Sequence, residues 1–246
     1  MLLSGTTSED LPAVPATGGG DVQTIFVSLS AREPDGRDAE YLHWHSLDHR
    51  PEQYRVAGLR HSMRLVSTPA CRAARAAAAD RYDRVDHVMT YYFTRDAAFD
   101  QFRALSVALS GDRRPFRLPS VDSGYFALKG KSVARGAVAG ADVIPWRPAR
   151  GVYLILESGA EPAAALSDVP GVAGVWWHEG GQSAAADVPG NAGVQLTYCY
   201  LEEDPISTAH RLRPVLERRW AKSGVQPLLA APFQMLVPFE WERHVP

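Results

Sequence analysis

The sequence predicts an α+β protein made of two consecutive units that share the element order β-α-β-β-α-β. Three observations support this prediction. Strand-like runs alternate with helix-like segments, a stretch rich in Gly, Ala and Pro divides the chain near its middle, and the second part repeats the order of the first. Of the 246 residues, 46% are apolar and 22% are charged, which is typical of a soluble globular protein with a well-filled core.

Residues 1–21 are expected to form a disordered leader, and residues 22–133 the first unit. Pro51 is expected to end the first helix of this unit, because proline lacks the N–H that an interior helical turn requires. The Ala-rich segment at residues 70–82 is expected to be either a short surface helix or a variable insertion. Strands are predicted at 22–30, 58–68, 85–94 and 123–133, and helices at 38–49 and 96–111.

Residues 134–150 are predicted to link the units, and residues 151–246 to form the second unit. Two β-α-β-β-α-β units give the ferredoxin-like order twice. One such unit covers one face of its sheet with helices and leaves the other face bare, so we expect the two units to pack sheet to sheet as a pseudo-dimer. The second unit is predicted to have strands at 151–158, 171–179, 194–202 and 228–241, and helices at 160–169 and 206–224.

Composition argues against several classes of partner. The formal net charge is −2, and Lys and Arg are scattered among acidic residues, so nucleic acid is not expected. No apolar run approaches the roughly 20 residues of a membrane-spanning helix. Cys71 and Cys199 lie far apart and outside any metal-binding spacing. We therefore expect a cytoplasmic protein without a membrane, metal or cofactor partner.

The segment from Tyr41 to Arg64 contains the pattern Trp-His-x-x-Asp-His-x-Pro-Glu, then a small residue and Gly before a strand that contains Arg. This pattern resembles the EthD-like group of dimeric α/β-barrel proteins, although Ala57 stands where that group usually has Pro. The resemblance is sharp over residues 38–66 and only topological elsewhere. It implies two ferredoxin-like units that close a barrel around a ligand-sized cavity, with a homodimer of the fused pair as a further expectation.

The expected first helix carries a stripe of polar side chains. Residues three, four and seven apart share a helix face, which groups Tyr41, His45, Asp48 and His49. His45 or His49 is a candidate base, with Asp48 as the group that orients it. Alternatively, these groups only cap the helix end and pair on the surface. The histidine spacing also suits a metal, but Ser46 stands where the helical zinc motif has Glu, so no metal is predicted.

Strand alternation yields further candidates. One face of the second strand would present Leu59, His61, Met63 and Leu65, and the other would present Arg64. In the third strand His87, Met89, Tyr91 and Phe93 would share a face. His61 and His87 either line one cavity or are hydrogen-bonded core residues. Tyr91 is a candidate orienting donor, and Arg64 could hold an anionic group. Trp176 and Trp177, in the second unit, are predicted to form an aromatic wall.

No counterpart of the His–Asp cluster occurs in the second unit, so an active site is expected in the first. The superfamily that the chain resembles includes cofactor-free monooxygenases, lactone isomerases, polyketide cyclases and haem-handling enzymes, so the fold does not fix the reaction. Our leading hypothesis is an enzyme that transforms a small planar, aromatic or lactone-like metabolite by His-assisted proton transfer or cofactor-free oxygenation. The alternatives are a non-catalytic small-molecule carrier or sensor, and a haem-binding protein with a histidine ligand.

Overall fold

The computed structural model describes residues 22–94, 98–111, 116–137, 139–159, 161–181 and 191–244. The fold is α+β, with one large antiparallel sheet and helices on its outside. The predicted leader, residues 1–21, lies outside the described residues. The strands are β1 (Thr24–Ser30), β2 (Leu59–Val66), β3 (Ala77–Ala78), β4 (His87–Phe93), β5 (Ser120–Val133), β6 (Gly151–Ser158), β7 (Val172–Gly180), β8 (Val194–Leu201) and β9 (Gln226–Met235).

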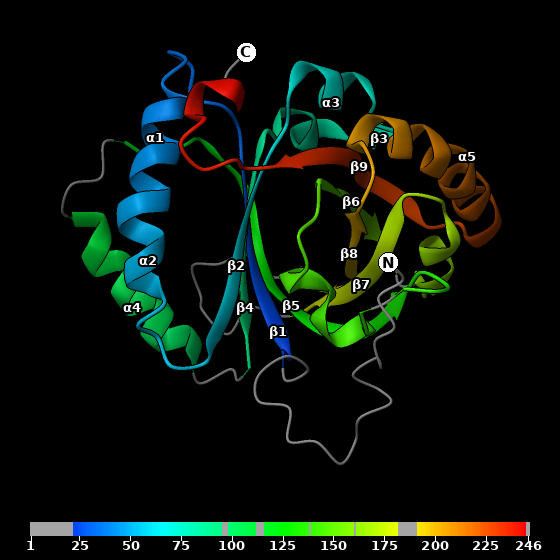
Figure 1. The fold of residues 1–246 in the computed structure, drawn as a ribbon, viewed down its shortest axis with the longest axis horizontal. Coiled ribbons are helices and arrows are strands. Elements are labelled where there is room, and N and C mark those ends of the chain that lie inside the picture. The colour runs from blue at the N-terminus through cyan, green and yellow to red at the C-terminus, as the bar shows by residue number, and fades with distance from the viewer. Residues whose placement is uncertain are drawn as a thin grey trace, which may run out of the picture.

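The sheet consists of two four-stranded halves with the same internal order. The first half runs β5-β1-β4-β2 and the second β9-β6-β8-β7, which is the ferredoxin-like order in each. Strand β5 pairs with β7, and β2 pairs with β9. The two halves therefore join along both edges, and the sheet closes into an α+β barrel (Figure 1).

The barrel interior is filled with side chains from both halves. Its apolar cluster includes Ile25 and Leu154, each almost completely buried, together with Trp176. A hydrogen bond between tyrosines links the two halves inside the barrel, where Tyr92 Oη lies 3.0 Å from Tyr200 Oη. Among the described residues, large aromatic side chains therefore occupy much of the barrel interior, and the cavity described below lies outside the barrel.

Helices cover the outside of each half. On the first half lie α1 (Asp38–Trp44), a π-helical turn (His45–His49), α2 (Arg50–Gln53) and α4 (Ala98–Gly111). The second half carries α5 (Pro205–Ser223), with the short α3 (Pro69–Ala73) beside it (Figure 1). Short 3-10 turns occur at Asp80–Arg84, Ala141–Trp146, Ala164–Asp168 and Trp241–His244. Among the helices of the described residues, none is long and apolar enough to cross a membrane.

Two predicted helix boundaries were wrong. The helix expected at 160–169 is only the 3-10 turn Ala164–Asp168, because Pro170 restricts Val169 to extended backbone and leaves too few residues for an α-helix. The helix expected to end at Pro51 instead continues to Gln53. The π-helical turn makes this continuation compatible with proline, since the Arg50 N–H bonds to the His45 carbonyl, five residues back.

One strand face was also predicted wrongly. A register shift between Leu59 and His61 in β2 breaks the simple alternation. Leu59 consequently packs with the outer cluster beneath the helices, whereas Met63 and Leu65 point into the barrel. His61 lies against Tyr92 and Trp146 on the interior side, so it does not share a face with Leu59.

Candidate functional site

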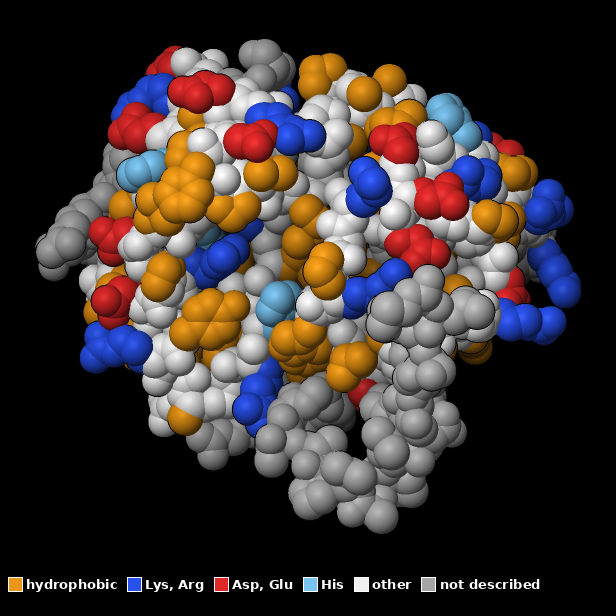
Figure 2. Space-filling view, viewed as in Figure 1, with side chains coloured by type: hydrophobic (Ala, Val, Ile, Leu, Met, Phe, Trp, Pro, Cys, Tyr) orange, Lys and Arg blue, Asp and Glu red, His pale blue; other side chains and the backbone are white. Residues whose placement is uncertain are grey.

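A cavity of about 350 Å³ lies between the outer sheet face of the first half and the helices α1, α2 and α4. The exposed residues Arg103, Val107 and Arg117 stand at its edge, so the cavity opens toward solvent there. Acidic and basic side chains are interspersed over the molecular face seen in Figure 2. Among the residues that the structure describes, no Asp or Glu lines the cavity. The lining is made of Phe26, Ser28, Ser30, Tyr41, His45, His49, Gln53, Arg64, Met89, Tyr91, Phe102, Arg103, Ser106, Val107, Arg117 and Tyr125.

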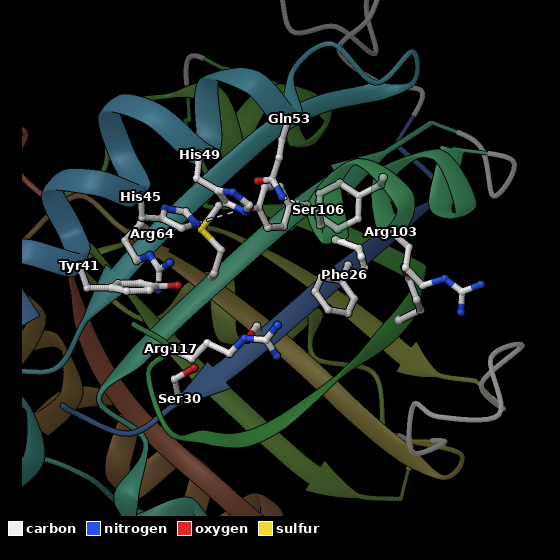
Figure 3. A pocket seen from close by; sticks show the side chains of 16 residues that line it. Phe26, Ser30, Tyr41, His45, His49, Gln53, Arg64, Arg103, Ser106 and Arg117 are labelled. Carbon is white, nitrogen blue, oxygen red and sulfur yellow. Dashed lines mark hydrogen bonds between the residues drawn. The ribbon is translucent and has the colours of Figure 1, made fainter. Parts of the chain in front are cut away.

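The helical wall of the cavity is built by residues spaced four apart. Tyr41, His45, His49 and Gln53 all face it, and Figure 3 shows them along one side of the continuous α1–α2 helix. The histidine rings of residues 45 and 49 have centroids 5.4 Å apart. The π turn keeps both histidines on the cavity side and lets the stripe continue past Pro51, and such turns are frequent at functional sites.

His45 meets the sheet wall through Tyr91. The Nε2 atom of His45 lies 3.2 Å from the Tyr91 hydroxyl, and both side chains are buried. Burial raises the pKa of Tyr91 above its ordinary value, so this hydroxyl stays protonated. The pair therefore presents a titratable imidazole and a neutral phenolic donor together at the cavity wall.

The rest of the wall combines aromatic rings with polar groups. The Phe26 ring packs against Phe102 and Tyr125, with centroid separations of 5.9 and 4.9 Å. Gln53 Nε2 donates to Ser106 Oγ at 2.8 Å and so links α2 to α4 across the cavity. These contacts give the cavity flat apolar surfaces and a few placed polar atoms, which is typical of small-molecule sites.

A buried acid–histidine pair lies next to the cavity. His87 Nε2 is 2.6 Å from Asp38 Oδ1, and both residues are almost fully buried. Burial lowers the pKa of His87, and the Arg64 charge lowers it further, against the opposing effect of Asp38. Burial by itself would raise the pKa of Asp38, but several opposing effects together lower it, led by the hydrogen bond from His87 and including the one from the Glu33 N–H. We therefore assign a neutral His87 that donates to an ionised Asp38.

The structure brings five predicted site residues together and separates five others from them. Tyr41, His45, His49, Arg64 and Tyr91 share the cavity. None of the other five lines it. Asp48 is half-buried on the helix, and His87 is paired with Asp38 behind the cavity wall. His61, Trp176 and Trp177 are the remaining three.

The cavity lies outside the barrel, so these last three residues do not line it. Burial, and then the charge of Arg50, lower the pKa of His61 to about 4, so it is a neutral residue of the barrel interior. Trp176 is fully buried there and donates Nε1–H to the Ala141 carbonyl at 2.8 Å. Trp177 packs on the outer cluster of the second half.

Sequence reasoning missed several cavity residues. Gln53 continues the spacing of Tyr41, His45 and His49, but it lay beyond the expected end of the helix at Pro51. Phe26 and Ser28 alternate with the inward-facing Val27, so strand periodicity could have identified their face. No local pattern marks Ser106 or Arg117, whose roles depend on how α4 and β5 pack.

In the part of the chain that the structure describes, no three side chains of His, Cys, Asp or Glu cluster as metal ligands. Haem ligation by His45 through Nε2 would require breaking the contact with Tyr91. His49 is the other histidine that lines the cavity, so it is the second candidate for a haem ligand. Absorption spectroscopy of the purified protein tests the haem alternative directly.

Comparison with known proteins supports the fold class. No family model and no curated protein matches the sequence. A solved structure named "Putative Chlorite dismutase" has 10% identity and a TM-score of 0.51, over 91% of this chain and 100% of that chain. A structure named "Putative monooxygenase", from Fusobacterium nucleatum, has 11% identity and a TM-score of 0.48, over 88% and 93%. An "anthrone oxidase-like protein" has 11% identity and a TM-score of 0.47, over 88% and 92%.

These identities are too low to transfer a reaction, so the comparison establishes the fold alone. The fold defines the chain as a ferredoxin-like α+β barrel of the dimeric-barrel type. The structure adds a cavity on the outer face of the first half, of a size that a small molecule could fill.

Proposed function

We propose that this protein binds a small planar metabolite in the first-half cavity and transforms it by proton transfer at His45. The carrying observation is the contact of 3.2 Å between His45 Nε2 and the Tyr91 hydroxyl on the wall of an aromatic-lined cavity. The unprotonated nitrogen of an imidazole can accept a proton, and His45 Nε2 lies on the cavity wall, where a bound ligand would sit. The EthD-like resemblance supports the choice of this cavity, because the segment that carries it, residues 38–66, supplies the helical wall and Arg64.

In the proposed reaction, the substrate displaces the Tyr91 hydroxyl from His45 Nε2. The imidazole then accepts a proton from a carbon next to a carbonyl group, and the electron pair of that C–H bond moves onto the carbonyl oxygen. Tyr91 remains protonated because burial raises its pKa, so its O–H donates a hydrogen bond to the enolate oxygen as it forms. Return of the proton at another carbon gives isomerisation. If the enolate carbon instead attacks a second carbonyl group of the same substrate, a C–C bond closes a ring and the resulting alkoxide takes the proton from His45. Reaction of the enolate with O2 gives cofactor-free oxygenation.

2-Tetralone, a planar ketone, tests this proposal. Exchange of its C1 protons in D2O, followed by proton NMR, reports enolate formation without requiring knowledge of the natural substrate. We expect the protein to accelerate this exchange, and we expect His45→Gln to abolish the acceleration. Tyr91→Phe should lower the rate about 100-fold, because it removes one donor to the enolate oxygen.

His43→Gln is the matched control, since His43 lies on the same helix but is exposed and contacts Trp241 outside the cavity. It should exchange protons at the wild-type rate. Unchanged exchange in His45→Gln, with 2-tetralone still bound, would contradict the catalytic proposal.

The carrier alternative makes the opposite forecast. A carrier would bind 2-tetralone with no acceleration of exchange in any variant, and the His45 and Tyr91 substitutions would change affinity only. A Soret band in the purified protein, lost in His49→Gln, would instead support the haem alternative.

A further inference from the structure

Arg64 is a buried cation that forms no ion pair within the described part of the chain. It lies on β2 opposite Met89, and only 4% of its surface is exposed. None of the ion pairs among the described residues includes it, and its buried Nε–H has no hydrogen-bond acceptor there. A buried charge is normally paired, because leaving water without a partner is costly. The position therefore carries a cost that the folded protein alone does not offset.

A buried carboxylate in the same region does not remove this cost. Asp38 is ionised and contributes a negative charge to the same region, but its Oδ1 accepts from His87 at 2.6 Å. The Arg64 charge is felt at His87, where it lowers the pKa, so the three groups are electrostatically coupled. Asp38 can balance charge at a distance, yet it does not accept a hydrogen bond from the Arg64 guanidinium.

The guanidinium is placed to meet a ligand. Arg64 lines the cavity, and its Cζ lies 5.5 Å from the centroid of the Tyr41 ring. Figure 3 shows Arg64 between Tyr41 and His45, and it shows the Arg117 guanidinium directed inward from the opposite side. The Arg64 fork matches the two oxygens of a carboxylate better than it matches a single neutral oxygen.

The remaining lining restricts the ligand further. Its described residues include three arginines and no acidic residue, so a cationic ligand would meet repulsion from them and an anion would meet attraction. Phe26, Phe102 and Tyr125 supply flat apolar surface, which a small inorganic ion would leave uncovered. An aromatic or otherwise conjugated carboxylate satisfies both features.

We propose that the natural ligand is a planar organic carboxylate, held with its carboxylate on Arg64 and its ring between the Phe26 wall and the His45–Tyr91 pair. This inference rests on the proposed function, because it uses the same cavity. It adds the chemical class of the substrate and assigns Arg64 as the residue that determines specificity. Arg117, at the cavity edge, adds a second positive charge near the carboxylate of the ligand.

The test compares two probes of nearly equal size and shape, 2-naphthoate and 2-naphthamide, by isothermal titration calorimetry at pH 7. The wild-type protein should bind naphthoate at least about tenfold more tightly, because hydrogen bonds to a charged group are the stronger kind. Arg64→Met keeps the length of the side chain and removes its charge. It should bind both probes with equal affinity, near that of the wild type for naphthamide.

Two further variants keep the test interpretable. Arg60→Met is the matched control, since Arg60 lies on the same strand but is exposed and outside the cavity, and it should retain the preference. Arg64→Lys keeps the positive charge but lacks the planar fork of the guanidinium, so this variant should retain only part of the preference for naphthoate. Arg64→Met should fold with an unchanged or raised Tm, because it removes a buried charge that lacks an acceptor.

The outcomes separate the two proposals. Equal affinity of the wild type for both probes, or an undiminished preference in Arg64→Met, would overturn the carboxylate assignment and leave the cavity proposal standing. Binding of neither probe, together with no binding of 2-tetralone, would overturn both proposals. A clearly lowered Tm of ligand-free Arg64→Met would show that Arg64 serves the fold, and would also overturn the assignment.

Discussion

The two halves of the barrel each have a layer of side chains between the sheet and its helices, and these layers differ in how a buried charge is paired. In the first half, Arg64 lies buried on the sheet with no acidic partner among the described residues. In the second half, Glu157 is 1% exposed and is fully partnered. It accepts from Arg219 Nη2 at 3.0 Å and from Trp220 Nε1 at 2.6 Å, both on α5.

The packing around Arg64 and Glu157 also differs between the two layers. The layer beneath α5 is packed with apolar side chains such as Tyr153, Leu212 and Leu216, all fully buried. The layer beneath α1, α2 and α4 contains the cavity of about 350 Å³. Because the two halves share one strand order, the difference lies in the side chains and helices that cover them. One layer stabilises the fold, and the other is available to a ligand.

The largest expected effect concerns the partnered charge. Glu157→Gln should destabilise the protein by about 3 kcal/mol, because it leaves the largely buried Arg219 without its counter-charge. Chemical denaturation measures this loss. Glu202→Gln is the control, since the Arg147–Glu202 pair is partly exposed and should be worth less than about 1 kcal/mol. A loss no larger than that of the control would remove the contrast with Arg64.

The next effect is a pH dependence of stability. Burial lowers the pKa of His178 to about 3, against a weaker opposing hydrogen bond to the Leu196 carbonyl. The unfolded chain therefore binds more protons than the folded one below about pH 6.5, so stability should fall as the pH decreases from there toward 3. One such group contributes a slope of about 1.4 kcal/mol per pH unit.

His178→Gln should make this slope shallower in denaturation curves recorded between pH 4 and pH 7. His61 and His87 also have lowered pKa values and act in the same direction over this range, so part of the slope will remain in the variant. His43→Gln should leave the slope unchanged, as His43 is exposed. Identical slopes in the wild type and His178→Gln would show that this imidazole is not held neutral.

A third comparison adds volume to each layer. Ala209→Leu, in the packed second half, should cost about 2 kcal/mol, because the surrounding side chains leave no room for three more carbons. Ser28→Leu, on the cavity floor, should change stability by less than about 0.5 kcal/mol and abolish binding of 2-naphthoate. Equal destabilisation by both substitutions would show that the first layer is as full as the second.

The smallest expected effect is at Gln53. Gln53→Leu removes the hydrogen bond to Ser106 that spans the cavity between α2 and α4, and should destabilise the protein by about 1 kcal/mol. Calorimetry should show naphthoate affinity within a few-fold of the wild type, because this contact lies away from Arg64. If Gln53→Leu lost the preference for naphthoate over naphthamide, the carboxylate would instead bind near Gln53 and Ser106.

Periodicity predicted the parts of the site that lie on regular elements. The stripe of Tyr41, His45 and His49 follows from helical spacing, and alternation in β4 placed His87, Met89 and Tyr91 on one face. The strand positions followed from apolar runs bounded by turn residues, such as the exact span of β6.

What sequence reasoning could not supply depends on local irregularity and on packing between distant segments. The register shift in β2 turned Leu59 away from the inward face of His61, Met63 and Leu65, and the π turn carried the helix past Pro51 to bring Gln53 into the site. Whether the interior or the outer layer stays open depends on how large side chains such as Trp176 and Tyr92 fill the barrel. Periodicity assigns a face to a residue, but it does not say which face meets the ligand.

The most direct test of the account is a crystal structure of the protein with 2-naphthoate. We predict the naphthalene ring between Phe26 and His45, in the first-half cavity, with the carboxylate within hydrogen-bond distance of Arg64. Electron density for the probe inside the barrel beside Trp176, or in the outer cavity with its carboxylate pointing away from Arg64, would contradict it.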